Sequence, residues 1–259
     1  MHYIGHMRDS VGVVIPTYNR PIETIKAIES VMNQTYEVKQ IILVDDGSIP
    51  ELRHELEYSL IGLPVEFVSI RATNHPGRAR NVGIDRVTSK WTAFLDSDDT
   101  WVKDKIEKQV QIAKELKVRS VCSNANFVDK NASIINVTDY HSGFITLRKL
   151  IKHNLIINSS VLVDTLLLRA VGKIDSRYSM RGAEDYVTWL NIAEKSNWYL
   201  CGENLVNYRV DSTDSVRLES QLSEIDSRVQ GLLGYLSTKN GNSLKSRIVA
   251  STITTLAKI

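Results

Sequence analysis

The sequence predicts an α/β domain in which helices cover both faces of a mostly parallel central sheet. Strongly apolar runs alternate with segments of helical spacing through the first half of the chain. Strands without polar alternation are typical of a sheet that is buried on both faces, and their alternation with helices favours parallel pairing. The predicted strands of this half cover residues 11–15, 40–44, 65–70 and 91–95.

The helices predicted between these strands have apolar residues at intervals of three or four. They cover residues 22–33, 51–60, 76–87 and 102–116, and Pro76 falls in a first turn, where proline is well tolerated. After residue 118 the pattern is weaker. It predicts strands at 118–128, 159–163, 198–200 and 205–210, and helices at 144–153, 166–171, 183–194 and from 215 to the end.

Composition limits the function classes. The 259 residues are 42% hydrophobic and 24% charged, which is typical of a soluble globular chain. A net charge of +2 is too balanced to indicate a nucleic-acid partner. Cys122 and Cys201 lie far apart, without metal or redox spacing, so we expect reduced thiols. No apolar run reaches membrane-spanning length and no secretory signal is visible, so we expect a cytoplasmic protein.

Four polar turns follow the four strands of the first half. They are Pro16–Asn19, Asp45–Ser48, Arg71–His75 and Asp96–Asp99. Ligands of open α/β sheets bind at the carboxyl ends of the strands, so we expect these turns to form one site. An aromatic ring, carboxylates and arginines suit a nucleotide's base and phosphates. Ordinary turn chemistry is the alternative for each turn taken singly.

The last of these turns, Asp96-Ser97-Asp98-Asp99, puts three carboxylates within four residues. Like charges repel by about 1 kcal/mol per pair at 4 Å in water. A cation would relieve this repulsion, and Mg²⁺ or Mn²⁺ is commonly held by one or two carboxylates together with substrate phosphates. The turn therefore predicts a metal and a phosphate-bearing substrate, with a solvated turn or helix cap as the alternative.

Five motifs, in order, resemble those of family 2 glycosyltransferases. They are Val14-Ile-Pro-Thr-Tyr-Asn-Arg20, Leu43-Val-Asp-Asp-Gly-Ser48, Gly77-Arg-Ala-Arg-Asn81, Phe94-Leu-Asp-Ser-Asp-Asp99, and Glu184-Asp185 with Trp189-Leu190 downstream. The resemblance spans about 11–208 and implies a GT-A fold, a Rossmann-like three-layer sandwich. Leu155–Ser160 is similar to an acceptor-side segment of enzymes that build bacterial surface polysaccharides such as O-antigen lipopolysaccharide.

The resemblance also implies domain bounds. It predicts a tail at 1–10, a GT-A domain at 11–212 and a helical extension at 213–259. Within the domain, 11–118 would bind the nucleotide and 119–212 the acceptor. The C-terminal helices are candidates for a contact with the inner membrane face or with a second subunit, and packing on the domain is the alternative.

Site roles are likewise implied by the resemblance. Asp185 is the expected general base and Asp98 the expected ligand of Mn²⁺ or Mg²⁺. Asp211 stands where many relatives have a histidine, so it is a candidate metal ligand or a solvated side chain. The residues implied for the nucleotide are Pro16, Thr17, Tyr18, Asn19, Arg20, Asp45, Asp46, Arg78, Arg80 and Asp96. Those implied for the donor sugar or the acceptor are Asp99, Trp101, Glu184 and Arg209, and packing in the core is the alternative for Trp101.

The expected reaction is inverting transfer of a hexose from a sugar nucleotide to a hydroxyl of a glycan or lipid-diphosphate-linked oligosaccharide, giving a β-linkage. UDP is the expected nucleotide, and GDP and TDP are the alternatives. Three alternative functions fit the sequence less well. A sugar-1-phosphate nucleotidyltransferase usually has a Gly-rich loop after the first strand, and 16–21 has no glycine. A dinucleotide oxidoreductase would need G-x-G-x-x-G there. A catalytically silent sugar-nucleotide binding module would not need the acids at 96, 98 and 185.

Overall fold

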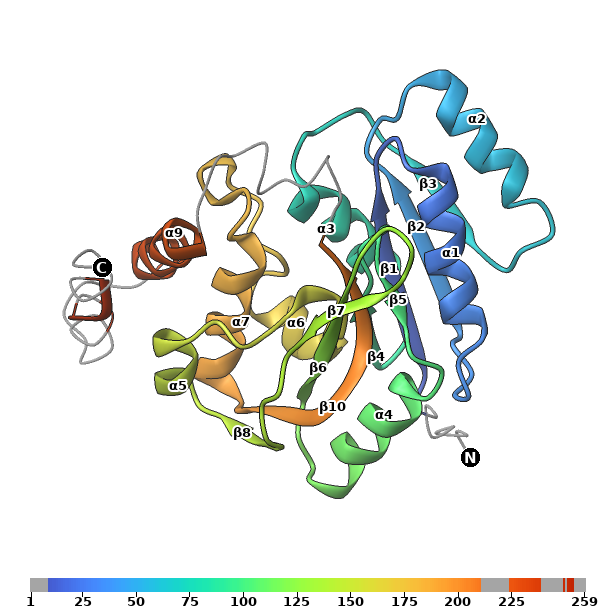
Figure 1. Ribbon diagram of the computed structural model, residues 1–259. Helices are drawn as coiled ribbons and strands as arrows, with labels where there is room; N and C mark the ends of the chain where they lie inside the picture. Colours follow the sequence, from blue (N-terminus) through green and yellow to red (C-terminus); the bar gives the residue numbers. More distant parts are fainter. Residues whose placement is uncertain (1–8, 211–223, 239–248, 250, 254–259) are drawn as a thin grey trace, which may run out of the picture.

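The computed structural model describes residues 9–210, 224–238, 249 and 251–253. A single mixed sheet runs through it in the order β3-β2-β1-β4-β9-β6-β10-β5, with β7 beside β6 and β8 beside β10. Figure 1 shows this sheet between its helices, with α9 packed at the side of α7. The strands are β1 Val11–Thr17, β2 Gln40–Asp45, β3 Glu66–Ser69, β4 Trp91–Phe94, β5 Thr100–Trp101, β6 Ser120–Val128, β7 Ile134–Val137, β8 Gly143–Ile145, β9 Leu162–Asp164 and β10 Trp198–Arg209.

The two halves of the sheet differ in strand direction. β3, β2, β1 and β4 pair parallel, in the register that sets Val13 beside Ile41 and Ala93. β9 is antiparallel to both β4 and β6, whereas β6 and β10 are again parallel. The parallel half therefore brings the carboxyl ends of β1, β2, β3 and β4 to one edge, as the sequence predicts.

Helices cover both faces of the sheet. On one face Val13 and Ile15 pack in a core that includes side chains of α1 and α4. On the other face Val14 packs with side chains of α3, α5, α6, α7 and α9. Val14 faces the opposite side from Val13 and Ile15 because successive side chains of a strand point to opposite faces of the sheet. The helices are α1 Pro21–Met32, α2 Pro50–Ser59, α3 Pro76–Arg86, α4 Lys105–Glu115, α5 Leu147–Lys152, α6 Thr165–Ala170, α7 Glu184–Lys195 and α9 Glu224–Ser237, with short 3-10 turns η1 Asn158–Ser160 and η2 Tyr178–Met180.

Most differences from the predicted elements lie after residue 118. The two strands predicted at 198–200 and 205–210 are one strand, β10, whose register against β6 shifts between Cys201 and Val206. The short strands β5, β7 and β8 were not predicted, because two to four residues are too few to show a period. Of the predicted extension at 213–259, the structure describes α9 and the helical residues 251–253, and most of the predicted tail lies outside the described residues.

Two further sequence predictions can be compared with the structure. Cys122 and Cys201 are both free and buried, as expected. In the part of the chain that the structure describes, no helix combines the length and apolar character needed to span a bilayer.

A buried lysine lies beneath the site edge of the sheet. Lys105, in the first turn of α4, is fully buried, and its Nζ donates to Gln109 Oε1 at 2.8 Å. The same Nζ lies 4.1 Å from the centre of the Trp101 ring. Burial lowers the pKa of Lys105 well below its usual value, because the charged form loses its hydration.

We expect Lys105→Met to remove a pH dependence of stability. The unfolded chain keeps a lysine pKa of about 10.4, so it binds more protons than the folded chain between the lowered pKa and that value. The stability of the wild type therefore rises with pH over this window. Urea unfolding at several pH values should show the wild type gaining free energy of unfolding relative to Lys105→Met as pH rises. Lys26→Met, on the exposed side of α1, is the control and should follow the wild-type profile. The prediction is contradicted if the free energies of unfolding of the wild type and Lys105→Met differ by the same amount at every pH.

Candidate active site

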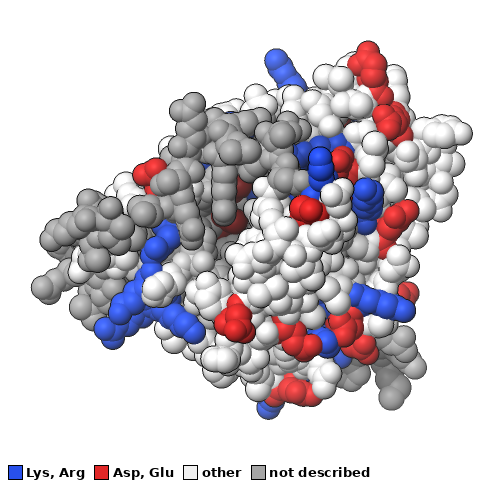
Figure 2. Space-filling model, viewed as in Figure 1, with Lys and Arg blue, Asp and Glu red and all other residues white. Residues whose placement is uncertain are grey.

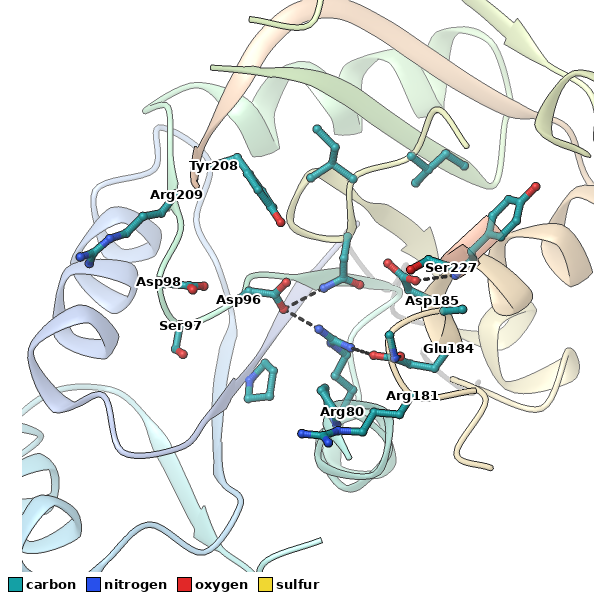
Figure 3. A pocket seen from close by; sticks show the side chains of 18 of the residues that line it. Arg80, Asp96, Ser97, Asp98, Arg181, Glu184, Asp185, Tyr208, Arg209 and Ser227 are labelled. Atoms are coloured by element: carbon teal, nitrogen blue, oxygen red, sulfur yellow. Dashed lines mark hydrogen bonds and ion pairs between the residues drawn. The ribbon is translucent and has the colours of Figure 1, made fainter. Parts of the chain in front are cut away.

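A cavity of about 610 Å³ opens at the edge where the parallel strands end. Its lining comes from the turns after β1, β2 and β4, from the segment 154–158, from the start of α7, and from α9. Figure 3 shows Asp98 and Arg209 on one side of this cavity, Asp185 and Ser227 on the other, and Asp96 and Arg80 between them. Residues from both predicted halves of the domain thus face one space.

The turns after β1 and β2 are tied to each other. The backbone N–H of Asn19 donates to Ser48 Oγ at 2.8 Å, and Asn19 Oδ1 accepts from the N–H of Ile49 at 2.9 Å. Gly47 has φ +79°, and a Cβ there would lie 2.4 Å from the backbone nitrogen of Ala72, so this turn requires glycine. The ties keep Tyr18, whose side chain is half exposed, at the cavity wall together with Pro16 and Thr17.

The two aspartates after β2 have different positions. Asp45 is fully buried and lies outside the cavity lining, where it accepts from Ser48 N–H at 3.1 Å and from Ser69 Oγ at 3.0 Å. Asp46 lines the cavity, and Thr73 donates to its carboxylate through N–H at 2.7 Å and through Oγ1 at 2.9 Å. Burial raises the pKa of Asp46, and these hydrogen bonds oppose the rise. Of these two implied nucleotide residues, the structure therefore places Asp46 at the cavity and Asp45 beneath it.

The three carboxylates after β4 point in three directions. Asp96 accepts from Arg80 Nη2 at 2.7 Å and from Asn158 Nδ2 at 2.9 Å. Asp98 lines the cavity, and its Oδ2 lies 2.6 Å from Arg20 Nη1. Asp99 is buried beneath the turn. Separate partners reduce the repulsion that the sequence predicts within this cluster.

Asp99 and Trp101 form a buried support rather than a wall of the cavity. Ser159 Oγ donates to Asp99 at 2.5 Å, and Arg209 N–H donates to the other carboxylate oxygen at 2.9 Å. Trp101 Nε1 donates to the Ser159 carbonyl at 2.8 Å. Burial, with the charges of Asp98 and Asp96, raises the pKa of Asp99 well above its usual value. Neither side chain lines the cavity, and both hold η1, so the sugar contacts of Asp99 and Trp101 stay predictions.

Arg80 bridges two carboxylates from distant parts of the chain. Its Nη2 lies 2.7 Å from Asp96, and its Nη1 lies 2.9 Å from Glu184 at the start of α7. Burial disfavours the charged guanidinium, but the attraction of Asp96 and Glu184 outweighs this and raises the pKa of Arg80. Glu184 also accepts from Gly182 N–H at 2.6 Å. Arg80 and Glu184 therefore form a buried link that positions α7 against the acidic turn, and both also line the cavity.

Asp185 is brought to the cavity by this link. It is the second residue of α7 and lines the cavity, and its Oδ1 accepts from the N–H of Tyr186 at 2.6 Å. Tyr186 is buried, and its hydroxyl donates to the carbonyl of Leu150 in α5 at 2.9 Å. Packing on both sides of Asp185 thus determines where its carboxylate lies. A carboxylate with these supports suits proton abstraction from a hydroxyl.

Three further predicted site residues, Arg209, Arg78 and Asp211, differ in where they lie. Arg209 lines the cavity and pairs with Glu23 at 3.3 Å. Arg78 does not line it, because its guanidinium stacks 4.1 Å from the centre of the Tyr178 ring. Asp211 lies outside the described residues.

Several functional candidates were not predicted individually. Asn158 and Ser159 hold the acidic turn, and only the wider segment Leu155–Ser160 carried a sequence signal. Asn154 lines the cavity from a segment that the sequence left without a role, and Tyr208 lines it from the segment in which only Arg209 and Asp211 were assigned. The positions of these residues at the cavity depend on which distant segments pack together, and a local sequence pattern does not predict such contacts.

The fold has helices on both faces of one sheet, and its cavity lies at the edge where the parallel strands end. This combination defines a GT-A-type α/β protein. The sequence profile described as Glycosyl transferase family 2 matches residues 12–170. The chain therefore belongs to glycosyltransferase family 2, which confirms the resemblance drawn from the motifs.

The curated relatives described here also carry glycosyltransferase names. The chain is 28% identical over 206 residues to the E. coli UDP-Glc:alpha-D-GlcNAc-diphosphoundecaprenol beta-1,3-glucosyltransferase WfgD, covering 78% of each chain. It is 27% identical over 202 residues to the putative teichuronic acid biosynthesis glycosyltransferase TuaG of Bacillus subtilis, covering 77% of this chain and 79% of that one. An uncharacterized glycosyltransferase of Rickettsia felis is 31% identical over 189 residues, which are 72% of this chain and 31% of that protein.

Solved structures confirm the fold. The crystal structure of S. aureus TarS 1–349 with UDP-GlcNAc superposes with a TM-score of 0.75 at 14% identity, over 96% of this chain and 71% of that one. The complex with UDP gives a TM-score of 0.72 over 96% of this chain and 72% of the other, at 16% identity.

Proposed function

We propose that the protein transfers a sugar from a nucleoside diphosphate donor, with UDP the expected nucleotide, to a hydroxyl of a glycan or lipid-linked oligosaccharide in bacterial surface polysaccharide synthesis. The observation that carries the proposal is one cavity with nucleotide-type turns at one end and Asp185 at the other. Family membership and the names of WfgD and TuaG support the reaction class.

The donor end of the cavity has the groups that a nucleotide needs. Tyr18 offers a half-exposed aromatic ring for the base, and Asp46 offers a carboxylate for a base N–H. Arg20 and Arg209 line the same end and can pair with phosphate oxygens. We assign the base contact to Asp46 rather than Asp45 because only Asp46 lines the cavity.

The residues fit a divalent metal held largely by the donor. Among the described residues no group of three or more potential ligand side chains forms a metal cluster. Asp98 already faces a cation, the guanidinium of Arg20, at 2.6 Å. One carboxylate completed by diphosphate and water oxygens is an ordinary Mg²⁺ or Mn²⁺ arrangement. Such an ion, when bound, supplies Lewis-acid neutralisation of the departing diphosphate.

We expect Asp98→Ala to abolish the metal dependence of donor binding. The substitution removes the carboxylate that faces the cavity and leaves Asp96 and Asp99 with their own partners. In calorimetric titrations, the wild type should bind UDP more tightly with Mn²⁺ than with EDTA. Asp98→Ala should bind UDP with the same affinity under both conditions. Asp104→Ala, on the surface near α4, is the matched control. A wild-type affinity that EDTA leaves unchanged would refute the metal assignment.

The proposed transfer is a single displacement. Asp185 takes the proton of the acceptor hydroxyl as the oxygen forms a bond to the anomeric carbon. The bond from that carbon to the diphosphate oxygen breaks on the opposite face, and the nucleoside diphosphate leaves with the electron pair. Configuration inverts, so an α-linked donor gives a β-linked product. No covalent enzyme intermediate is needed.

The reaction class is tested by a panel of sugar nucleotides. Thermal unfolding with Mn²⁺ should show stabilisation by one donor, because a ligand that binds only the folded state raises apparent stability. Release of nucleoside diphosphate should then depend on an added acceptor. Stabilisation by sugar-1-phosphate and a nucleoside triphosphate instead would favour a nucleotidyltransferase, and donor binding without transfer would favour a silent binding module.

A further inference from the structure

Helix α9 is held close to the active-site helix by two glycines. A Cβ at Gly231 would lie 2.5 Å from Cδ1 of Tyr186, and one at Gly234 would lie 2.1 Å from Sδ of Met180. Leu232 and Tyr235, on the same helix, are fully buried. Because the backbone of α9 rests directly on these neighbours, its first turns are brought to the cavity, where Ser227 and Arg228 form part of the lining.

Arg228 is a cavity-lining cation without a carboxylate partner. Its Nη2 donates to the carbonyl of Lys152, the last residue of α5. Its Nε is buried and has no acceptor. Among the residues that the structure describes, no carboxylate lies within ion-pair distance of this guanidinium. A partly buried guanidinium in this state favours an anionic ligand, because charge pairing and the missing hydrogen bond would both be supplied.

More positive charge continues from Arg228 onto the surface. Arg148, Lys149 and Lys152 lie within five residues on α5, and all three side chains are exposed. None has an ion-pair partner in the described part of the chain. Figure 2 shows Lys and Arg side chains gathered on the left of the molecule, over α5. We call Arg148, Lys149, Lys152 and Arg228 the basic ridge.

Other cations near the start of α7 are already paired. Arg177 makes a two-pronged contact with Asp175, with Nε 3.0 Å from each carboxylate oxygen. Lys173 pairs with Asp85. These ion pairs leave Arg177 and Lys173 less available to a second anion than the cations of α5 and α9.

We propose that the basic ridge binds the diphosphate of a lipid-linked sugar acceptor, with the sugar directed at Asp185. This inference rests on the proposed function. Asp185 and Arg228 line the same cavity, and the Tyr186 hydroxyl ties α7 to α5 between them. Arg228 matches two phosphate oxygens with its planar fork, and the α5 cations extend the site outward along the path of the lipid. The cavity then has one phosphate site for the donor and a second for the acceptor.

Farnesyl diphosphate tests the acceptor phosphate site, because it carries the diphosphate on a lipid chain and has no sugar or nucleotide. Calorimetry on the full chain, with saturating UDP and equal Mn²⁺ in cell and syringe, should show binding of farnesyl diphosphate and not of farnesol. We expect Arg228→Gln to weaken this binding about tenfold or more, since a charge-assisted hydrogen bond is lost. Arg228→Lys should retain part of the affinity, and Lys149→Glu with Lys152→Glu should weaken it and flatten its salt dependence.

The control is Arg86→Gln, on the exposed end of α3, which should bind farnesyl diphosphate as the wild type does. Unchanged UDP affinity in the same samples shows that each variant is folded. Equal binding by Arg228→Gln and wild type, equal binding of farnesol, or no binding of the diphosphate by wild type would each overturn the inference. Failure of UDP itself to bind would count against the proposed function instead.

Discussion

Replacing Asp185 by Asn should lower the rate of sugar transfer by about 10²–10⁴-fold, the usual contribution of a positioned general base. The amide has nearly the shape of the carboxylate and can still accept from the N–H of Tyr186, which lies 2.6 Å away in the wild type. It cannot take the proton of the acceptor hydroxyl. The loss should therefore appear in kcat, while the affinity for UDP measured by calorimetry stays at the wild-type value.

Asp85→Asn is the matched control, because this aspartate lies on the exposed side of α3 and pairs with Lys173. We expect it to transfer sugar at the wild-type rate. A wild-type rate in Asp185→Asn, with the thermal unfolding temperature unchanged, would show that another group accepts the proton. A loss of UDP affinity would show instead that Asp185 acts on the donor.

Arg80→Met should destabilise the protein by about 3–5 kcal/mol, the typical cost of removing one partner of a buried ion pair. Glu184 is 5% exposed, and without Arg80 the hydrogen bond from Gly182 is the one that its carboxylate keeps among the described residues. Asp96 would keep Asn158 as its partner. Arg80→Lys should recover only part of the loss, because one ammonium cannot reproduce a planar contact to two carboxylates. Urea unfolding measures the difference.

The matched control on the same helix is Arg86→Met. Arg86 pairs with Glu66 at 3.2 Å, with both side chains largely exposed, and exposed pairs contribute at most about 1 kcal/mol. In a double-mutant cycle, Glu184→Gln should restore much of the stability lost in Arg80→Met, because no buried charge is then left without a partner. If Arg80→Met unfolds like Arg86→Met, the buried link has no energetic role.

The nucleotide half could be predicted because its signals are local. An apolar run such as Gln40–Val44 can be buried on both faces only as a central strand, and the polar turn after it must lie at the strand's carboxyl end. The same rule predicts that Pro16, Asp46 and Asp98 lie at one edge of the sheet, and all three line the cavity there. The acceptor half was predicted less well because its strands pair with distant partners in both directions.

Neighbouring acids illustrate the limit of the sequence. Asp96, Asp98 and Asp99 belong to one motif, and the motif alone indicates a cation and a phosphate-bearing substrate. Their separate roles depend on Arg80, Arg20 and Ser159, which are between 16 and 78 residues away along the chain. Residue identity determines what a carboxylate can do, but its partners determine which way it faces.

The sequence by itself determined the family, the order of the first strands and helices, and the edge of the sheet at which the predicted site residues gather, because each depends on short-range periodicity and on motifs. Only the tertiary structure decided that Asp45, Asp99 and Trp101 are supports, that Arg80 links Asp96 to Glu184, and that Arg228 of α9 enters the cavity. Those outcomes depend on burial and on contacts between residues far apart in the chain. The energy of a buried charge is set by its partners, and only the folded chain brings the partners together.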